Sequence, residues 1–155
     1  MIPIRARDVV AWSGGRLLRG AADTIFQGVS TDTRGDLSGK LFVALTGAHH
    51  DAHAFLGQAQ SGGAAGLLVQ RPEAVPDGAR IAVIAVPETT LALGAIATGH
   101  RASFTGPVVA ITGSNGKTTT KEMMASILTG AGPTLATRGN LNNHLGVPLT
   151  LLRPE

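Results

Sequence analysis

Residues 108–129 read VVAITGSNGKTTTKEMMASILT and join an apolar run, a glycine-rich turn and a helical pattern. The run at 108–112 predicts a buried strand, and residues 113–116 predict a tight turn because glycine tolerates positive φ. Apolar side chains then recur at the spacing of one helix face: Met123, Met124, Ile127 and Leu128. We therefore predict a helix over 117–129, stopped near Gly130.

The turn has the chemistry of a phosphate-binding loop. Gly113 and Gly116 allow the backbone N–H groups to approach an anion, and the helix start adds its positive dipole end. Lys117 offers a mobile charge to the outer phosphates, and Thr118 offers a hydroxyl to Mg²⁺. The G-x-x-x-x-G-K-[ST] pattern lacks its first glycine, since Ile111 stands there. A plain glycine turn with a surface lysine is the alternative, but the flanking strand and helix favour nucleotide binding.

The preceding residues also alternate between strand and helix patterns. Apolar runs predict strands at 41–45, 66–69 and 81–86, and helical patterns cover 52–60 and 88–103. This alternation indicates an α/β fold. We expect a small mixed α/β domain, followed by the start of a P-loop-type domain with a parallel sheet.

The breaker Thr105-Gly-Pro107 marks a boundary between these two units. We place the first unit at 1–86, a connecting helix and linker at 87–106, and an incomplete second unit at 107–155. A parallel nucleotide-binding sheet needs more βα units than the second unit holds. We therefore expect a truncated domain with uncovered aliphatic faces, in a chain that binds ligands but does not by itself complete a reaction.

Composition excludes several classes of protein. The 155 residues include no cysteine, so disulfides and thiolate metal sites are excluded. The net charge of +3 comes from scattered basic residues, which argues against nucleic-acid binding. No apolar run approaches the length of a membrane span, and the N-terminus does not have the pattern of a signal peptide. We expect a cytoplasmic protein that does not insert into membranes.

Residues 110–123 resemble the ATP loop of the Mur ligases, the ATP-dependent enzymes that build the peptide stem of the peptidoglycan precursor. The loop of that family characteristically lacks the first glycine, in agreement with Ile111. Residues 137–152 resemble the stretch that follows the loop in the member adding D-alanyl-D-alanine. The segments GVSTDTR at 28–34, GKLFVAL at 39–45 and DAHAF at 51–55 look like the family's UDP-sugar-binding domain.

The resemblance implies an amide ligase that adds D-alanyl-D-alanine to UDP-N-acetylmuramoyl-tripeptide through an acyl phosphate, with ATP and Mg²⁺ as cofactors. It also implies a monomer at full length. Three alternatives stay open: the ligase that adds the third stem residue, a relative of folylpolyglutamate synthase, and a non-catalytic module that binds a nucleotide or a UDP-sugar.

The resemblance also assigns roles to residues. The ATP site comprises Gly113, Ser114, Asn115, Gly116, Lys117, Thr118 and Thr119. Within it, Lys117 and Thr118 take the catalytic roles, and Thr118 is the Mg²⁺ ligand. The UDP-substrate site comprises Ser30, Thr31, Asp32, Thr33, Arg34, Asn140, Asn142 and Asn143. Turn and capping chemistry is the alternative for residues 30–34, and an irregular loop is the alternative for the asparagines.

A histidine-rich segment follows the strand predicted at 41–45. His49, His50, Asp51 and His53 lie within five residues of one another. Histidine and aspartate ligate metals, but no distant fourth ligand is evident. We interpret the histidines as surface residues or nucleotide contacts rather than as a metal site.

Overall fold

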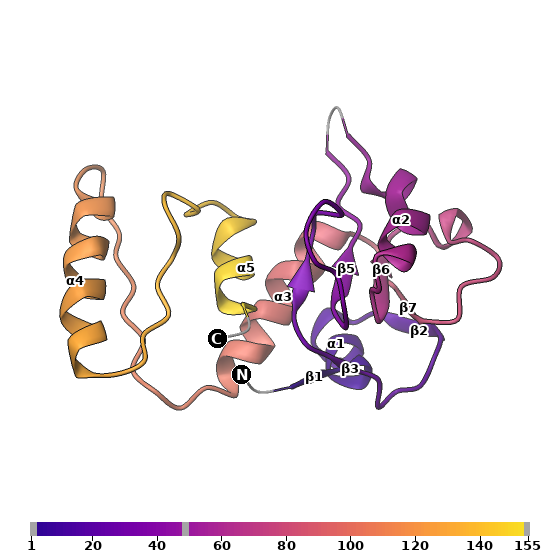
Figure 1. Ribbon diagram of the computed structural model, residues 1–155, viewed down its shortest axis with the longest axis horizontal. Coiled ribbons are helices and arrows are strands. Elements are labelled where there is room, and N and C mark those ends of the chain that lie inside the picture. The colour runs from indigo at the N-terminus through magenta and orange to yellow at the C-terminus, as the bar shows by residue number, and fades with distance from the viewer. Residues whose placement is uncertain (1–2, 48–49, 154–155) are drawn as a thin grey trace.

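A five-stranded mixed sheet is the centre of the fold in the computed structural model, which describes residues 3–47 and 50–153 (Figure 1). The strand order is β2-β7-β6-β5-β4. The strands are β2 (Arg16–Arg19), β4 (Val29–Ser30), β5 (Leu41–Val43), β6 (Gly66–Val69) and β7 (Ala82–Ala85). Neighbours from β4 to β7 pair in parallel, and β2 closes one edge antiparallel to β7. Beside this sheet, β1 (Ile4–Arg5) and β3 (Ile25–Phe26) form a two-stranded antiparallel pair.

Alternate residues of the central strands point to opposite faces of the sheet. On β7, Ile84 packs in one apolar cluster and Val83 in the other; on β6, Leu68 and Leu67 divide in the same way. This period of two follows from the pleat of a strand. Both faces are buried, as expected for parallel strands covered by helices.

Helices cover both faces of the sheet. The first face carries α1 (Ala6–Ser13) and α3 (Thr89–Ala102), and the second carries the short helices η1 (Ala52–Phe55) and α2 (Leu56–Ser61). A further short turn, η2 (Pro72–Ala74), follows β6. Four predicted elements therefore have counterparts in the structure. The strands predicted at 66–69 and 81–86 correspond to β6 and β7, and the helices predicted at 52–60 and 88–103 correspond to η1 with α2 and to α3.

The helix α3 is part of the core and is more than a connector. Leu93 and Ile96 are fully buried among residues of the sheet and α1. Gly99 allows α1 to approach closely, because a Cβ atom there would lie 2.3 Å from the ring of Trp12. The last helix, α5 (Gly146–Leu151), packs against α3, and Leu152 just after it is fully buried (Figure 1).

The glycine loop and α4 (Lys117–Ala131) lie apart from the sheet at one end of the molecule (Figure 1). The helix matches the prediction over 117–129 and runs just past Gly130, but it buries no residue. The predicted strand at 108–112 is wrong: these residues form no strand, and Val108 and Val109 are half exposed. A parallel strand needs a neighbour for its backbone hydrogen bonds, and no described strand lies alongside this segment.

None of the helices in residues 3–47 and 50–153 combines the length and the apolar character that crossing a membrane requires.

Candidate functional site

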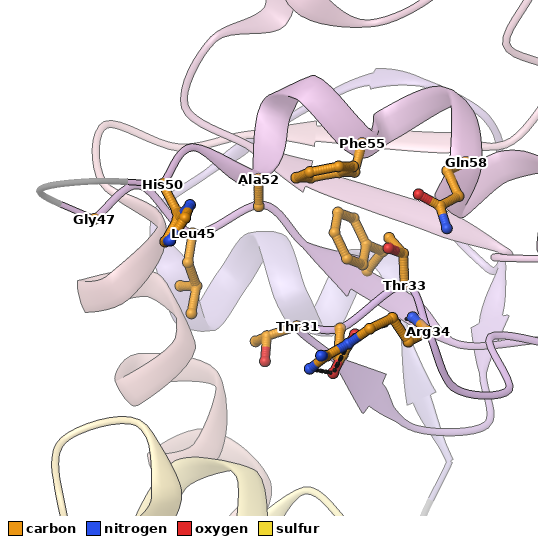
Figure 2. Close-up of a pocket in the computed structure, with 11 residues that line it drawn as sticks. Thr31, Thr33, Arg34, Leu45, Gly47, His50, Ala52, Phe55 and Gln58 are labelled. Carbon is orange, nitrogen blue, oxygen red and sulfur yellow. Dashed lines mark hydrogen bonds and ion pairs between the residues drawn. The ribbon is translucent and has the colours of Figure 1, made fainter.

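An open pocket of about 530 Å³ lies at the carboxyl ends of β4 and β5. Ligands commonly bind at this edge of an open parallel sheet, because loops from neighbouring strands converge there. In Figure 2, Thr31, Thr33 and Arg34 face Ala52, Phe55 and Gln58 across the opening. The complete lining comprises Thr31, Asp32, Thr33, Arg34, Phe42, Leu45, Gly47, His50, Ala52, Phe55 and Gln58.

Four of the five UDP-site residues predicted at 30–34 line this pocket, and the fifth, Ser30 at the end of β4, shapes the turn. The Ser30 hydroxyl accepts a hydrogen bond from the Asp32 N–H at 3.2 Å and donates one to the Asp32 carbonyl at 3.0 Å. This is the serine turn that we held as the alternative for the segment. The turn interpretation is therefore confirmed for Ser30, and the same turn presents Thr31 to Arg34 to the pocket. A role for these residues in binding UDP stays a prediction.

Asp32 and Arg34 form a two-pronged ion pair at the pocket rim. Arg34 Nη2 lies 2.6 Å from Asp32 Oδ2, and Arg34 Nε lies 2.9 Å from Oδ1. The hydrogen bonds from Arg34 lower the pKa of Asp32 to about 2, and the carboxylate in turn raises the pKa of Arg34. Both groups thus stay charged at neutral pH. The Arg34 side chain is 87% exposed, so its guanidinium is accessible to an anionic ligand.

The histidine-rich segment divides between the pocket and the interior. His49 lies outside the described residues, and His50 lines the pocket. The interpretation of His53 as a surface residue or nucleotide contact is wrong, because the residue is 4% exposed and does not line the pocket. Its ring Nδ1 lies 2.7 Å from Asp51 Oδ1, and burial lowers its pKa.

The glycine loop has the backbone geometry that the sequence predicted. Gly113 has φ of 145° and Gly116 has φ of 77°, a region that other residues rarely adopt. Gly116 precedes α4 and no side chain caps the helix, so its first N–H groups can receive an anion. Lys117 Nζ folds back and donates to the Gly113 carbonyl at 2.5 Å, which holds the ammonium over the loop.

These residues fit a phosphate better than they fit a metal alone. The uncapped helix start, the two glycines and Lys117 supply donors and positive charge. Ser114, Asn115, Thr118 and Thr119 are exposed at the same end of α4. Among the described residues, no three His, Cys, Asp or Glu side chains gather to hold a metal ion. A magnesium ion at Thr118 would therefore take most of its ligands from phosphate oxygens and water.

The three asparagines do not line the pocket. Asn143 Oδ1 accepts hydrogen bonds from the N–H groups of Leu145 (3.2 Å) and Gly146 (2.7 Å), where α5 begins. Asn140 and Asn142 are exposed, and none of the three lines the pocket. Asn143 therefore has a local structural contact, and a ligand role for the asparagines stays a prediction.

Sequence reasoning did not assign several pocket residues. Phe42, Leu45 and Gly47 come from β5 and the residues after it, while Phe55 and Gln58 come from η1 and α2. A usable signal was present, because loops that follow parallel strands meet at one edge of the sheet. The order of the strands was missing, and it places the loop after β4 beside the loop after β5.

Comparison with known proteins connects this geometry to a family. The family profile for the Mur ligase middle domain matches residues 111–155. Over 132 residues, the chain is 50% identical to the UDP-N-acetylmuramoyl-tripeptide–D-alanyl-D-alanine ligase of Escherichia coli K12. That match covers 85% of this chain and 28% of the relative, so the chain spans little more than a quarter of the relative's length.

Solved structures agree with the sequence matches. The fold superposes on MurF from Acinetobacter baumannii with a TM-score of 0.84 and 42% identity, over 99% of this chain and 34% of that one. MurF ligase from Thermotoga maritima in complex with ADP gives a TM-score of 0.70 and 30% identity, over 83% of this chain and 29% of that one. The chain belongs to the Mur ligase family. Within that family, the relatives described here are the D-alanyl-D-alanine-adding ligases called MurF.

Proposed function

We propose that this chain is the substrate-binding part, with the start of the ATP-binding part, of an ATP-dependent ligase that adds D-alanyl-D-alanine to UDP-N-acetylmuramoyl-tripeptide. The pocket at the ends of β4 and β5 carries the proposal, because it gathers Thr31, Asp32, Thr33 and Arg34, four of the residues that the family resemblance assigns to the UDP site. The similarity to D-alanyl-D-alanine-adding ligases supports the choice of substrate.

In this proposal, the described residues bind and orient the substrates. Thr31 and Thr33 offer hydroxyls to the nucleotide, and Arg34 offers a planar guanidinium to the diphosphate. ATP, when bound, supplies the phosphoryl group that activates the substrate carboxylate for attack by an amine. Residues 113–119 bind its phosphates, Lys117 places positive charge where phosphoryl transfer builds negative charge, and Thr118 ligates Mg²⁺.

The domain boundaries are also proposals. A UDP-binding unit precedes an ATP-binding unit that begins near residue 107. The burial of Leu93 and Ile96 supports assigning α3 to the first unit, with a linker only after Ala102. The segment after Ala102 packs loosely, since Phe104, Val108 and Val109 are half exposed.

Calorimetry on this chain with UDP-N-acetylmuramoyl-tripeptide tests the first site. We expect measurable binding that Arg34→Ala weakens by about tenfold or more, because a charged hydrogen-bond donor to phosphate is lost. Arg19→Ala is the matched control. Arg19 lies on β2, at the opposite edge of the sheet, and donates to the carbonyls of Pro76 and Asp77. No binding by the folded wild-type chain would contradict the proposal.

Ligation by the full-length protein that contains this chain tests the second site. We expect Lys117→Ala to reduce the rate by about 100-fold or more, since a charge that stabilises the transition state is removed. Binding of the UDP substrate should persist in the same variant, because Lys117 does not line that pocket. Retained ligation would overturn the role of Lys117. An amine other than D-alanyl-D-alanine, used in its place, would identify another member of the family.

A further inference from the structure

The ring of His53 is built into the loop that follows β5. Asp51 caps η1 by accepting the His53 backbone N–H at 2.9 Å, and the same carboxylate oxygen lies 2.7 Å from ring Nδ1. The side chain is 1% exposed. Such a ring needs partners at both nitrogens, because an unsatisfied buried polar atom is costly.

The other ring nitrogen reaches the end of the next strand. His53 Nε2 lies 3.1 Å from the backbone nitrogen of Gln70 and 3.3 Å from that of Arg71, directly after β6. Backbone N–H groups only donate, so Nε2 accepts, and the ring proton is on Nδ1, where it donates to Asp51. The ring is therefore neutral and has one defined tautomer.

The same contacts continue to the start of α3. The Gln70 side-chain oxygen accepts a hydrogen bond from the Thr89 N–H at 3.2 Å. The Thr89 hydroxyl also donates to the Ala44 carbonyl at 2.8 Å. The Arg71 guanidinium contacts the Asp51 carboxylate as well. These bonds join the ends of β5 and β6 to the first turn of α3.

The segment that these bonds hold is one wall of the pocket. Residues of this wall lie before, between and after Asp51 and His53 in the chain: Leu45, Gly47, His50, Ala52 and Phe55. His53 itself lines no part of the pocket. We propose that His53 is a positioning residue, which fixes the described part of the pocket wall, at 45–47 and 50–55, to the end of β6 by accepting hydrogen bonds from two backbone N–H groups while donating to Asp51.

Ligand affinity tests this proposal, which rests on the proposed UDP-substrate site. With UDP-N-acetylmuramoyl-tripeptide as the probe, we expect His53→Leu to weaken binding by about tenfold or more, because both backbone donors lose their acceptor. His53→Gln keeps an oxygen acceptor near the position of Nε2 and should recover most of the affinity.

The matched control is His100→Leu. His100 is also a buried histidine, 8% exposed, but it lies on α3 with its ring 6.4 Å from that of Trp12 and does not line the pocket. It should leave the affinity unchanged even where it lowers stability. If His53→Leu has the same affinity for the UDP ligand as His100→Leu, His53 has no positioning role.

Amide hydrogen exchange without ligand separates this proposal from the proposed function. His53→Leu, or His53→Gln if the leucine variant does not fold, is compared with wild type at the amides of Gln70 and Arg71 and of residues 50–56. Faster exchange at these amides, with exchange in α1 unchanged, supports the positioning role of His53. This holds even if the wild-type chain binds no UDP ligand, because the absence of binding would refute only the UDP site. Unchanged exchange in the variant would overturn the positioning role of His53.

The pH profile adds a readout that simple loss of packing does not produce. The charged groups around the ring are Asp51, Arg71 and, at longer range, Glu73. Protonated Nε2 would face two N–H donors, so wild-type affinity should fall as pH drops below about 6.5, the ordinary histidine value. The ratio of wild-type to His53→Gln affinity removes the pH dependence that the two proteins share, including that of the ligand. A ratio that is independent of pH would contradict the acceptor role.

Discussion

The sheet with the helices that cover it forms one region of this molecule, and the glycine loop with α4 forms a second region. The two regions carry similar sequence signals and have different structures. Residues 66–69 and 108–112 are both short apolar runs next to glycine, yet the first is the fully buried strand β6 and the second forms no strand. β6 has parallel neighbours on both sides, β5 and β7. The segment at 108–112 pairs with no described strand. An apolar run therefore permits a strand but does not by itself produce one, because the strand forms only where neighbouring strands pair with it.

The helices show the same contrast. α3 buries Leu93 and Ile96 against the sheet, whereas the apolar face of α4 is exposed at Met123 and Ile127. Burial of apolar area is the main contribution to stability, so the first region should hold nearly all of the stability of this chain. Substitutions at matched positions in the two helices can test this difference.

The largest expected effect comes from a pair of isoleucines. Ile96→Ala in α3 should lower the free energy of unfolding by about 2–5 kcal/mol, because it leaves a cavity in a packed core. Ile127→Ala in α4 should change it by less than about 0.5 kcal/mol, since that side chain is 68% exposed. Urea denaturation followed by the fluorescence of Trp12 measures both. Equal effects would show that α4 has packing partners that the structure does not place there.

A pair of helical glycines gives the next effect. Gly99→Ala should destabilise by about 1–3 kcal/mol, because its Cβ would overlap the Trp12 ring. Gly130→Ala meets nothing within 4 Å and should be neutral or stabilise by up to about 1 kcal/mol through helix propensity. Denaturation monitored by far-UV circular dichroism compares the two. A stabilising Gly99→Ala would contradict the close approach of α1 and α3.

A smaller effect should depend on pH. Burial lowers the pKa of both His53 and His100, so the unfolded chain binds more protons than the folded chain just below about pH 6.5. These residues therefore contribute stability that is complete above that pH and is lost as the pH falls through the range below it. Urea midpoints between about pH 7.5 and 5.5 measure the slope. Replacing both histidines with leucine should flatten it, and an unchanged slope would assign it to other groups.

The smallest expected effect is local to the second region. Lys121 Nζ donates to the carbonyls of Thr137 (2.6 Å) and Gly139 (2.9 Å), which connects α4 to the segment before α5. Lys121→Met should speed amide exchange over 137–143 while leaving the urea midpoint unchanged, because no core contact is lost. Glu122→Gln, which removes only the exposed ion-pair partner of Lys121, is the control. A large shift of the midpoint would show that the two regions are coupled.

The sequence predicted the elements that have a continuous apolar run or a regular apolar spacing of their own. β6 has the predicted bounds, β7 and α3 lie within theirs, and α4 begins at the predicted residue and ends two residues later. Short elements carry too little pattern to detect. β1, β3 and β4 have two residues each, and the edge strand β2 buries little of its surface. α5 was missed because the residue directly before it, Leu145, has no capping side chain. The Gly146 N–H at the start of the helix donates instead to the side chain of Asn143.

The candidate site was predicted only in part, for a related reason. Thr31 to Arg34 were recognised as a group because they are contiguous. Leu45, His50 and Phe55 join them only because β5 pairs with β4 and places its loop alongside. His53 was misplaced at the surface, since the backbone N–H groups that donate to its ring belong to Gln70 and Arg71, which lie far along the chain.

The amino-acid sequence by itself determined the α/β class, the glycine loop before α4, and the family resemblance that the comparisons confirm. These features depend on residues close together in the chain, where local conformation and spacing act directly. Tertiary structure alone decided that α3 belongs to the core, that 108–112 is not a strand, and that His53 is buried while His50 lines a pocket. Each of these outcomes depends on which distant segments become neighbours, and strand pairing and burial arise only from such neighbours.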